Sequence, residues 1–148
     1  MCLKTLSSKK EINEFKKTIG PKGITVYKVV RKEDGKYHPL FKYAFIPFKL
    51  GLNKANITEK IELGDWLEEG NQTYQSGFHF WVNKKNAENN KKWLKNTYNN
   101  EWCSDSYEVI ECIIKKSWIT YMGMNHMKDN LYGQTVVTNK AIFPEYKE

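Results

Sequence analysis

A histidine and a tryptophan stand two residues apart in a short segment that reads Gly-Phe-His-Phe-Trp-Val. Side chains alternate between the two faces of a strand, so Phe78 and Phe80 would share one face while His79 and Trp81 share the other. Val82 shares the face of the two phenylalanines, and three apolar residues predict that this face belongs to the core. An aromatic wall beside a titratable ring could then line a ligand pocket on the opposite face. The alternative is that a helix covers this face and His79 is an ordinary hydrogen-bonded histidine.

A carboxylate, Glu111, stands in the middle of the apolar segment 107–115, which reads YEVIECIIK. Alternation places Glu111 on the face opposite Cys112. An isolated buried carboxylate is costly, so Glu111 needs a partner or water. It could act as a general base in a desolvated setting. The alternative is an ion pair with a lysine at the edge of a sheet.

The three cysteines, Cys2, Cys103 and Cys112, form an odd count without a C-x-x-C pair. This pattern argues against a disulfide framework and against a cysteine-rich zinc site. Cys112 fits an inert core thiol, and Cys103 lies beside hydroxyl and carboxylate groups that could support a nucleophile. Removal of Met1 would leave Cys2 with a free amine that could serve as its own base.

No metal-binding or phosphate-binding motif is visible in the chain. The histidines His38, His79 and His126 are scattered, and none is followed at metal-ligand spacing by a second histidine or a cysteine. Walker, dinucleotide-binding and nucleophile-elbow glycine patterns are also missing. The sequence therefore predicts no metal site.

The elements that must hold these residues follow from local signals. Ser8 and Glu11 match a capping box that opens a short amphipathic helix ending at Gly20, and an Asp-Gly pair predicts a hairpin. We expect a single domain over residues 1–148 with a flexible arm at 1–7. The fold class is α+β, with a mainly antiparallel sheet and two principal helices. The expected helices are 8–19 and 84–95; strands are 24–31, 77–82, 107–115 and 134–143; a loop is 124–133.

Composition limits the class of partner. The formal net charge is +7, but only Arg31 among 24 basic residues is an arginine. Lysine is a solvated point charge and lacks the planar fork that reads guanine, so sequence-specific nucleic-acid binding is not expected. The apolar stretches are too short for a membrane span, and no apolar secretion signal stands at the start. These features predict a cytoplasmic protein without a membrane partner.

Three blocks together resemble the ADP-ribosyltransferase scaffold. The first is Val26-Tyr-Lys-Val-Val-Arg31, similar in position to that family's first strand. The second is Gly77-Phe-His-Phe-Trp81 followed by a helix with Ala87. The third is Gln134-Thr-Val-Val-Thr138 with Pro144-Glu-Tyr146 after it.

The resemblance implies a domain that binds NAD, as a substrate, or a ligand of the ADP-ribose type. Lys28, His79 and Trp81 would contact the ligand, with Trp81 stacking and Lys28 meeting a phosphate. Lys28 stands where the family has a histidine or arginine, and Gln134 where it has the catalytic glutamate. Glutamine cannot accept a proton or stabilise an oxocarbenium-like centre by charge, so the activity would be weakened, altered or replaced by binding. Gln134 and Glu111 are the catalytic candidates.

The opening Met-Cys-Leu-Lys, the Gly-Phe-His segment and the closing Val-Val-Thr-Asn-Lys resemble small uncharacterised proteins of bacteriophages and mobile elements. This likeness implies a host-directed accessory protein. The alternative to ligand binding is therefore a non-catalytic module that binds or inhibits a host protein. Lysines and the tryptophans Trp66, Trp93 and Trp102 would form its contact surface.

Overall fold

The computed structural model describes residues 3, 5–33, 35–39, 48–55, 60–62, 73–75, 77–97, 106–128 and 131–144. Its elements, in chain order, are β1 (Thr5–Leu6), α1 (Lys9–Lys17), β2 (Ile24–Glu33), β3 (Lys36–His38), β4 (Gly51–Lys54), β5 (Lys60–Glu62), β6 (Thr73–Gln75), β7 (Phe78–Trp81), α2 (Lys84–Thr97), β8 (Ser106–Ile114), the 3₁₀ turn η2 (Lys116–Trp118), β9 (Ile119–Lys128), β10 (Leu131–Thr138) and β11 (Lys140–Phe143).

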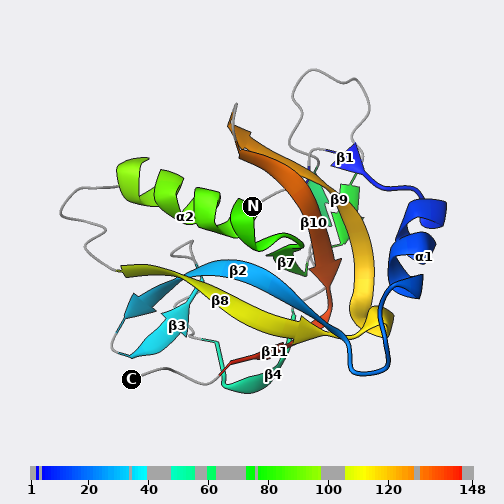
Figure 1. Cartoon of the computed structure of the whole chain (residues 1–148), viewed down its shortest axis with the longest axis horizontal. Helices are drawn as coiled ribbons and strands as arrows, with labels where there is room; N and C mark the ends of the chain where they lie inside the picture. The colour runs from blue at the N-terminus through cyan, green and yellow to red at the C-terminus, as the bar shows by residue number, and fades with distance from the viewer. Residues whose placement is uncertain are drawn as a thin grey trace.

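One large antiparallel sheet organises the chain (Figure 1). Its strands follow the order β1-β9-β10-β7-β2-β8-β11-β4, and β3 pairs with the far part of β2. Strands β5 and β6 form a separate pair. The prediction of an α+β fold with a mainly antiparallel sheet is confirmed, and both expected helices are present.

A long bent hairpin forms half of the sheet. The short turn η2 joins β8 to β9, and both strands belong to the sheet. The chain then returns antiparallel, with β10 paired to β9 and β11 paired to β8. The bend lies where the backbone N–H of Asn139 donates to the carbonyl of Trp118, at 3.1 Å. The expected loop at 124–133 is therefore wrong for residues 124–128 and 131–133, which are strand. These residues are held in strand by the backbone pairing of β9 with β10, for which their sequence carries no clear alternation.

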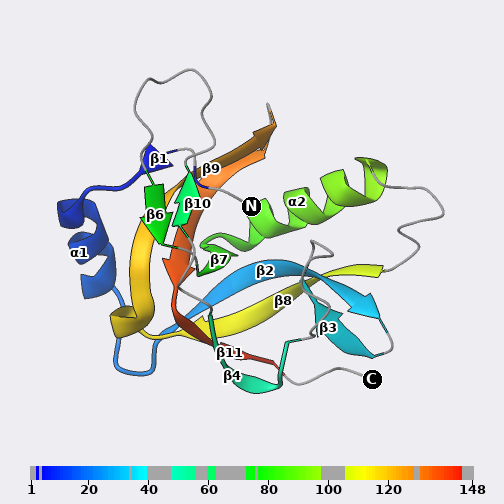
Figure 2. The same ribbon diagram turned by 180° about the vertical axis from the view of Figure 1, so that it is seen from behind.

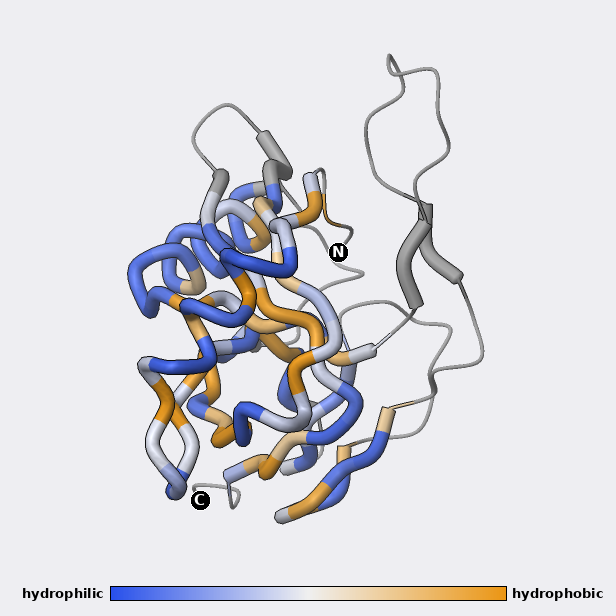
Figure 3. The backbone as a smooth tube through the Cα atoms, turned by 90° about the vertical axis from the view of Figure 1, so that its right-hand side faces the viewer, coloured by the Kyte–Doolittle hydropathy of each residue, from blue (hydrophilic) through white to orange (hydrophobic). Residues whose placement is uncertain are grey.

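The first core lies on one face of the sheet. The sheet curves strongly, because β7 and β11 are separated by two strands and yet contact each other across this core. The ring centroids of Phe78 on β7 and Phe143 on β11 are 5.6 Å apart. The helix α1 adds Ile12 and Phe15 to this face. Figure 3 shows the helices mostly hydrophilic, in keeping with a core built from strands. The buried members of the first core are Ile19, Val26, Val30, Tyr37, Phe80, Ile110, Cys112, Ile114, Ile119, Met122, Val136, Ala141 and Phe143.

The second core lies on the opposite face, under α2, which occupies the angle between β2–β8 and β10 (Figure 1). It comprises Val29, Trp81, Ala87, Leu94 and Tyr107. Alternation along β2 and β7 sends neighbouring residues to opposite faces, so the two cores share these strands.

The segment expected to be a flexible arm differs from that expectation where the structure describes it. Thr5 and Leu6 form β1, which pairs with β9. Leu3 is fully buried and packs with Val137 and the half-buried Tyr121. Burial of a leucine contributes about 2 kcal/mol, and the strand hydrogen bonds of β1 add to it. Together they act against the cost of ordering these residues, about 1–2 kcal/mol each.

Candidate functional site

Three blocks that are far apart in sequence lie on three neighbouring strands. Lys28 belongs to β2, His79 and Trp81 to β7, and Gln134 to β10, and these strands follow one another as β10-β7-β2. The pairing of Tyr27 with Trp81 sets the register between β2 and β7. The sheet therefore brings all four candidate ligand and catalytic residues of these blocks into its centre.

Lys28 and Gln134 lie on the same face of the sheet. Lys28 stands between Val26 and Val30, both members of the first core. Gln134 accepts the backbone N–H of Val82 at 3.1 Å, and Val82 packs against the first core. Their strands are separated by β7, and Gln134 lies two residues from Val136, which is level with Phe80 and Lys28. Their Cα atoms are therefore about 12 Å apart.

The Lys28 ammonium is set among apolar groups. Its Nζ donates a hydrogen bond to the carbonyl oxygen of His79 at 3.0 Å and lies 5.4 Å from the ring centroid of Phe80. Burial lowers the pKa of Lys28 to about 8 because the charged form loses its hydration; the nearby Cys112 opposes this shift. The residue keeps part of its surface exposed. At neutral pH it is therefore a poorly hydrated cation.

Cys112 lies near the Lys28 ammonium and carries no charge at neutral pH. Its side chain is fully buried, and burial raises the pKa of the thiol to about 12, with Lys28 acting in the opposite direction. The strand β8 places it there through the pairing of Val26 with Cys112. A neutral thiol supplies no counter-charge to Lys28, which agrees with the interpretation of Cys112 as a core residue.

His79 is buried and uncharged. Its Nδ1 lies 3.1 Å from the carbonyl oxygen of Gly77. Burial, assisted by the positive charge of Lys28, lowers the pKa of His79 to about 3. Its side chain lies on the face opposite Lys28, so the contact between them uses the histidine backbone rather than the ring.

Trp81 is a core residue in this structure. Only 1% of it is exposed, and it lies under α2 with Ala87 and Leu94. Its Nε1 donates to the buried Oδ1 of Asn90 at 3.4 Å. The predicted segregation of the two phenylalanines from His79 and Trp81 is confirmed, but the helix covers the tryptophan.

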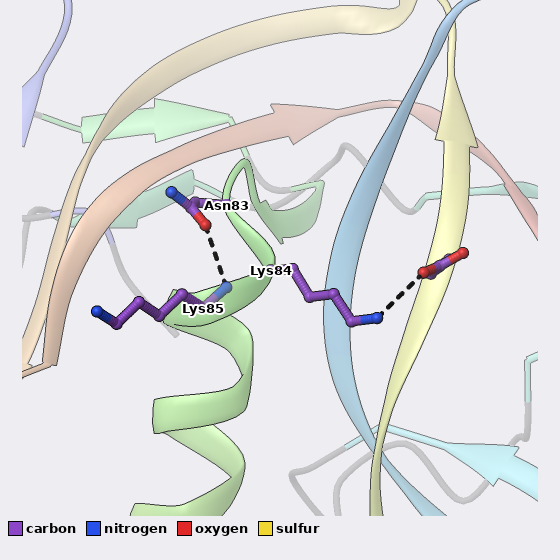
Figure 4. A network of polar contacts seen from close by, with 4 residues as sticks. Asn83, Lys84 and Lys85 are labelled. Carbon is purple, nitrogen blue, oxygen red and sulfur yellow. Dashed lines mark hydrogen bonds and ion pairs between the residues drawn. The ribbon is translucent and has the colours of Figure 1, made fainter.

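Glu111 has a lysine partner. Figure 4 shows Lys84, at the start of α2, reaching the carboxylate of Glu111 on β8, with N···O 3.6 Å. The Glu111 side chain is 59% exposed. Asn83 caps the same helix end, because its Oδ1 accepts the backbone N–H of Lys85 at 3.1 Å. The pair joins the helix to the sheet in a hydrated setting, unlike that of a general base.

Several sequence candidates lie outside the described residues, namely Cys2, Cys103, Trp66 and Trp102. Trp93 is half-buried against the second core. Within the described ranges no three His, Cys, Asp or Glu side chains group as metal ligands. None of the helices described there is both long and apolar enough to cross a membrane.

Comparison with known proteins gives no assignment: no family model, no curated protein and no solved structure matches this chain. The site must therefore be interpreted from its own chemistry. Its central feature is the cation of Lys28, which sequence reasoning selected by position but did not place in the first core. Val26 and Val30 flank Lys28 at two-residue spacing, but Val29 lies on the other face, so the sequence did not identify the inward face.

Proposed function

We propose that this protein binds a phosphate-bearing ligand of the NAD or ADP-ribose type, with the Lys28 ammonium as its anion contact. The observation that carries the proposal is the setting of that ammonium. An ammonium has three N–H donors, and the described residues offer this one a single hydrogen-bond acceptor, a neutral carbonyl. A buried cation without a counter-charge is unfavourable. A phosphate would supply both the charge and the missing acceptors.

The arrangement of the three blocks supports a ligand of this size. The blocks that resemble the ADP-ribosyltransferase scaffold lie on adjacent central strands, and Lys28 and Gln134 share a face about 12 Å apart. A dinucleotide is long enough to touch both. Because Gln134 stands at the position of the expected catalytic carboxylate, we propose ligand binding with weak or altered transferase chemistry.

Isothermal titration and thermal-shift measurements with NAD and with ADP-ribose at pH 7 test this function. Ligand at a hundred times its Kd should stabilise the protein by about 2.7 kcal/mol. Adenosine, which lacks the diphosphate, should bind at least about tenfold more weakly. A matched control replaces Lys95, an exposed lysine of α2, by methionine.

Lys28→Met should abolish the response to both phosphate-bearing ligands, whereas Lys95→Met should leave it unchanged. The affinity should fall as the pH rises above about 8, where free Lys28 loses its proton. The absence of any response at millimolar ligand would contradict the proposal. So would a response that survives in the Lys28→Met protein.

A further inference from the structure

A second site suggests itself on the face of the sheet that α2 leaves uncovered. The helix packs over Tyr107 and Val109 of β8 and reaches Glu111 through Lys84. Beyond that point Ile113 is 40% exposed. Figure 2 shows β11 between β8 and β4 in this part of the molecule, away from α2.

An apolar row crosses these three strands. Ile142 on β11 pairs with Leu52 on one side and with Ile113 on the other. Paired residues share a face, so the three aliphatic side chains lie side by side at about 5 Å spacing. Leu52 is 50% exposed. Their neighbours Cys112, Ala141 and Phe143 point into the first core, so the row faces outward.

A lysine row runs beside the apolar row. Lys140 pairs directly with Lys54, two residues along from the pair Ile142 and Leu52. Lys115 follows Ile113 by two residues in extended backbone. The lysine row and the apolar row are about 7 Å apart. Like charges directly opposite each other on a sheet are destabilising, and neither Lys54 nor Lys140 has a carboxylate partner among the described residues.

A hollow adjoins both rows. It has a volume of about 380 Å³ and is lined by Lys49, Leu52, Asn53 and Lys54. The Asn53 side chain is already committed to the backbone, accepting from Lys49 N–H at 3.0 Å and donating to its carbonyl at 2.7 Å. The polar groups left for a ligand are the two lysine ammonium groups.

We propose that the surface formed by Leu52, Ile113, Ile142, Lys54, Lys140 and the hollow at Lys49 binds an acidic segment of another protein. Carboxylates of the segment lie against the lysines, with one in the hollow, and aliphatic side chains of the segment cover the apolar row. Charge complementarity identifies this partner: binding would relieve repulsion between lysines that face one another. The site is independent of the Lys28 site, which lies on the other face.

Other occupants fit the same surface less well. A nucleic acid would neutralise the lysines but leave the aliphatic row in water, since the row offers no aromatic ring for base stacking. A second copy of the chain, joined through the same surface by a two-fold axis, would bring the same positive charge to both sides of the interface. A membrane would gain little, because membrane binding scales with the apolar area that is buried, and three aliphatic side chains offer only a small area.

Fluorescence anisotropy with a short labelled peptide of glutamate and leucine tests the site. Binding should weaken at least about tenfold when glutamine replaces its glutamates and when alanine replaces its leucines. In the protein, Lys54→Glu and Leu52→Asp should each weaken binding at least about tenfold. Both residues are exposed, and circular dichroism should show an unchanged fold.

Lys95→Glu on α2 is the matched control for charge, and it should change the affinity less than twofold. An equal loss with Lys95→Glu and Lys54→Glu would overturn the site, because attraction would then be a property of the whole charged molecule. Failure of the peptide to bind would also overturn it. So would tighter binding to oligothymidylate or phosphatidylserine vesicles, or concentration-dependent dimerisation on sedimentation that Leu52→Asp abolishes.

Discussion

Lys28 stands at an inward position of β2, where an apolar residue would be the stable choice. Its neighbours on that face, Val26 and Val30, are fully buried. The hydrogen bond to the His79 carbonyl and the contact with Phe80 compensate the lost hydration only in part, as the lowered pKa of Lys28 shows. Residues that cost stability without an evident structural gain are typical of binding sites.

Replacing this lysine should therefore stabilise the free protein. Because the pKa of Lys28 falls from 10.5 in the unfolded chain to about 8 in the folded protein, the unfolded state holds more protons between these values. The penalty is complete below pH 8 and disappears as the pH rises towards 10.5. We expect Lys28→Met to raise the free energy of unfolding by about 1–3 kcal/mol at pH 7.

Urea denaturation of the wild-type and Lys28→Met proteins from pH 6 to pH 10 measures this difference. The gain should shrink above pH 8 and vanish near pH 10.5. A loss of stability at pH 7 would show instead that the Lys28 hydrogen bond is a net structural contribution. Lys95→Met serves as the control with no expected pH-dependent effect.

Gln134 offers a test of the chemistry that the resemblance implies. Gln134→Glu would restore a carboxylate at an exposed position on the same face as Lys28. If NAD binds there, the carboxylate can stabilise positive charge developing at the ribose, which an amide cannot. We expect an increase of at least about tenfold in the rate of NAD cleavage, measured by release of nicotinamide.

The matched variant Gln134→Met has no charge to offer and should leave the rate at its wild-type value. Equal rates in the Gln134→Glu and wild-type proteins would show that this position does not face the scissile bond.

The sequence predicts the strand face and the burial of some residues but not of others. The separation of Phe78 and Phe80 from His79 and Trp81 follows from alternation, and it is confirmed. Glu111 has the expected lysine partner, but the lysine belongs to α2 and not to the edge of the sheet. The inward position of Lys28 could not be predicted, because β2 carries valines on both faces and alternation does not reveal which one is the first core. Burial of Trp81 depends on where α2 lies, which is a tertiary property.

At the scale of elements, capping signals are the most informative part of the sequence. Ser8 and Glu11 form the expected reciprocal capping box, with hydrogen bonds of 3.1 and 3.2 Å. The local signal suffices because both partners lie within one turn. The hairpin of β9 and β10 carries no comparable signal, and its ladder joins Leu131 to Lys128 through backbone groups that any residue possesses.

The start of α2 should depend more on its cap than on its ion pair. Asn83→Ala removes the acceptor for the N–H of Lys85, and we expect a loss of about 1 kcal/mol in the free energy of unfolding. Glu111→Gln removes the exposed contact with Lys84 and should cost at most about 0.5 kcal/mol. Denaturant titration at two salt concentrations distinguishes them, since only the ion pair is screened. A larger loss from Glu111→Gln would contradict this ranking.

At the scale of the whole molecule, the candidate site depends on pairings between distant segments. The strands β2, β7 and β10 become neighbours although about fifty residues separate each from the next. Local patterns predict each strand but carry no information on which strands pair. The sequence therefore predicted the fold class and the strand that became β7, whereas the common face of Lys28 and Gln134 required the structure.

The N-terminal segment packs on the face of the sheet that carries His79. Leu3 packs on Val137, which pairs directly with His79 across β10 and β7. Leu3→Ala should cost about 2–4 kcal/mol, because the side chain is fully buried. Thr5→Ala, at an exposed position of the same segment, should cost much less.

Packing of Leu3 should also control the hydration of His79. If the alanine variant admits water beside Val137, the pKa of His79 should rise from about 3 towards its ordinary value near 6.5, because burial is the main cause of its depression. A pH titration of the histidine ring protons by NMR measures this directly. The rise should be absent in Thr5→Ala. An unchanged pKa together with unchanged stability would mean that Leu3 does not seal this face, whereas its fully buried side chain requires that it does.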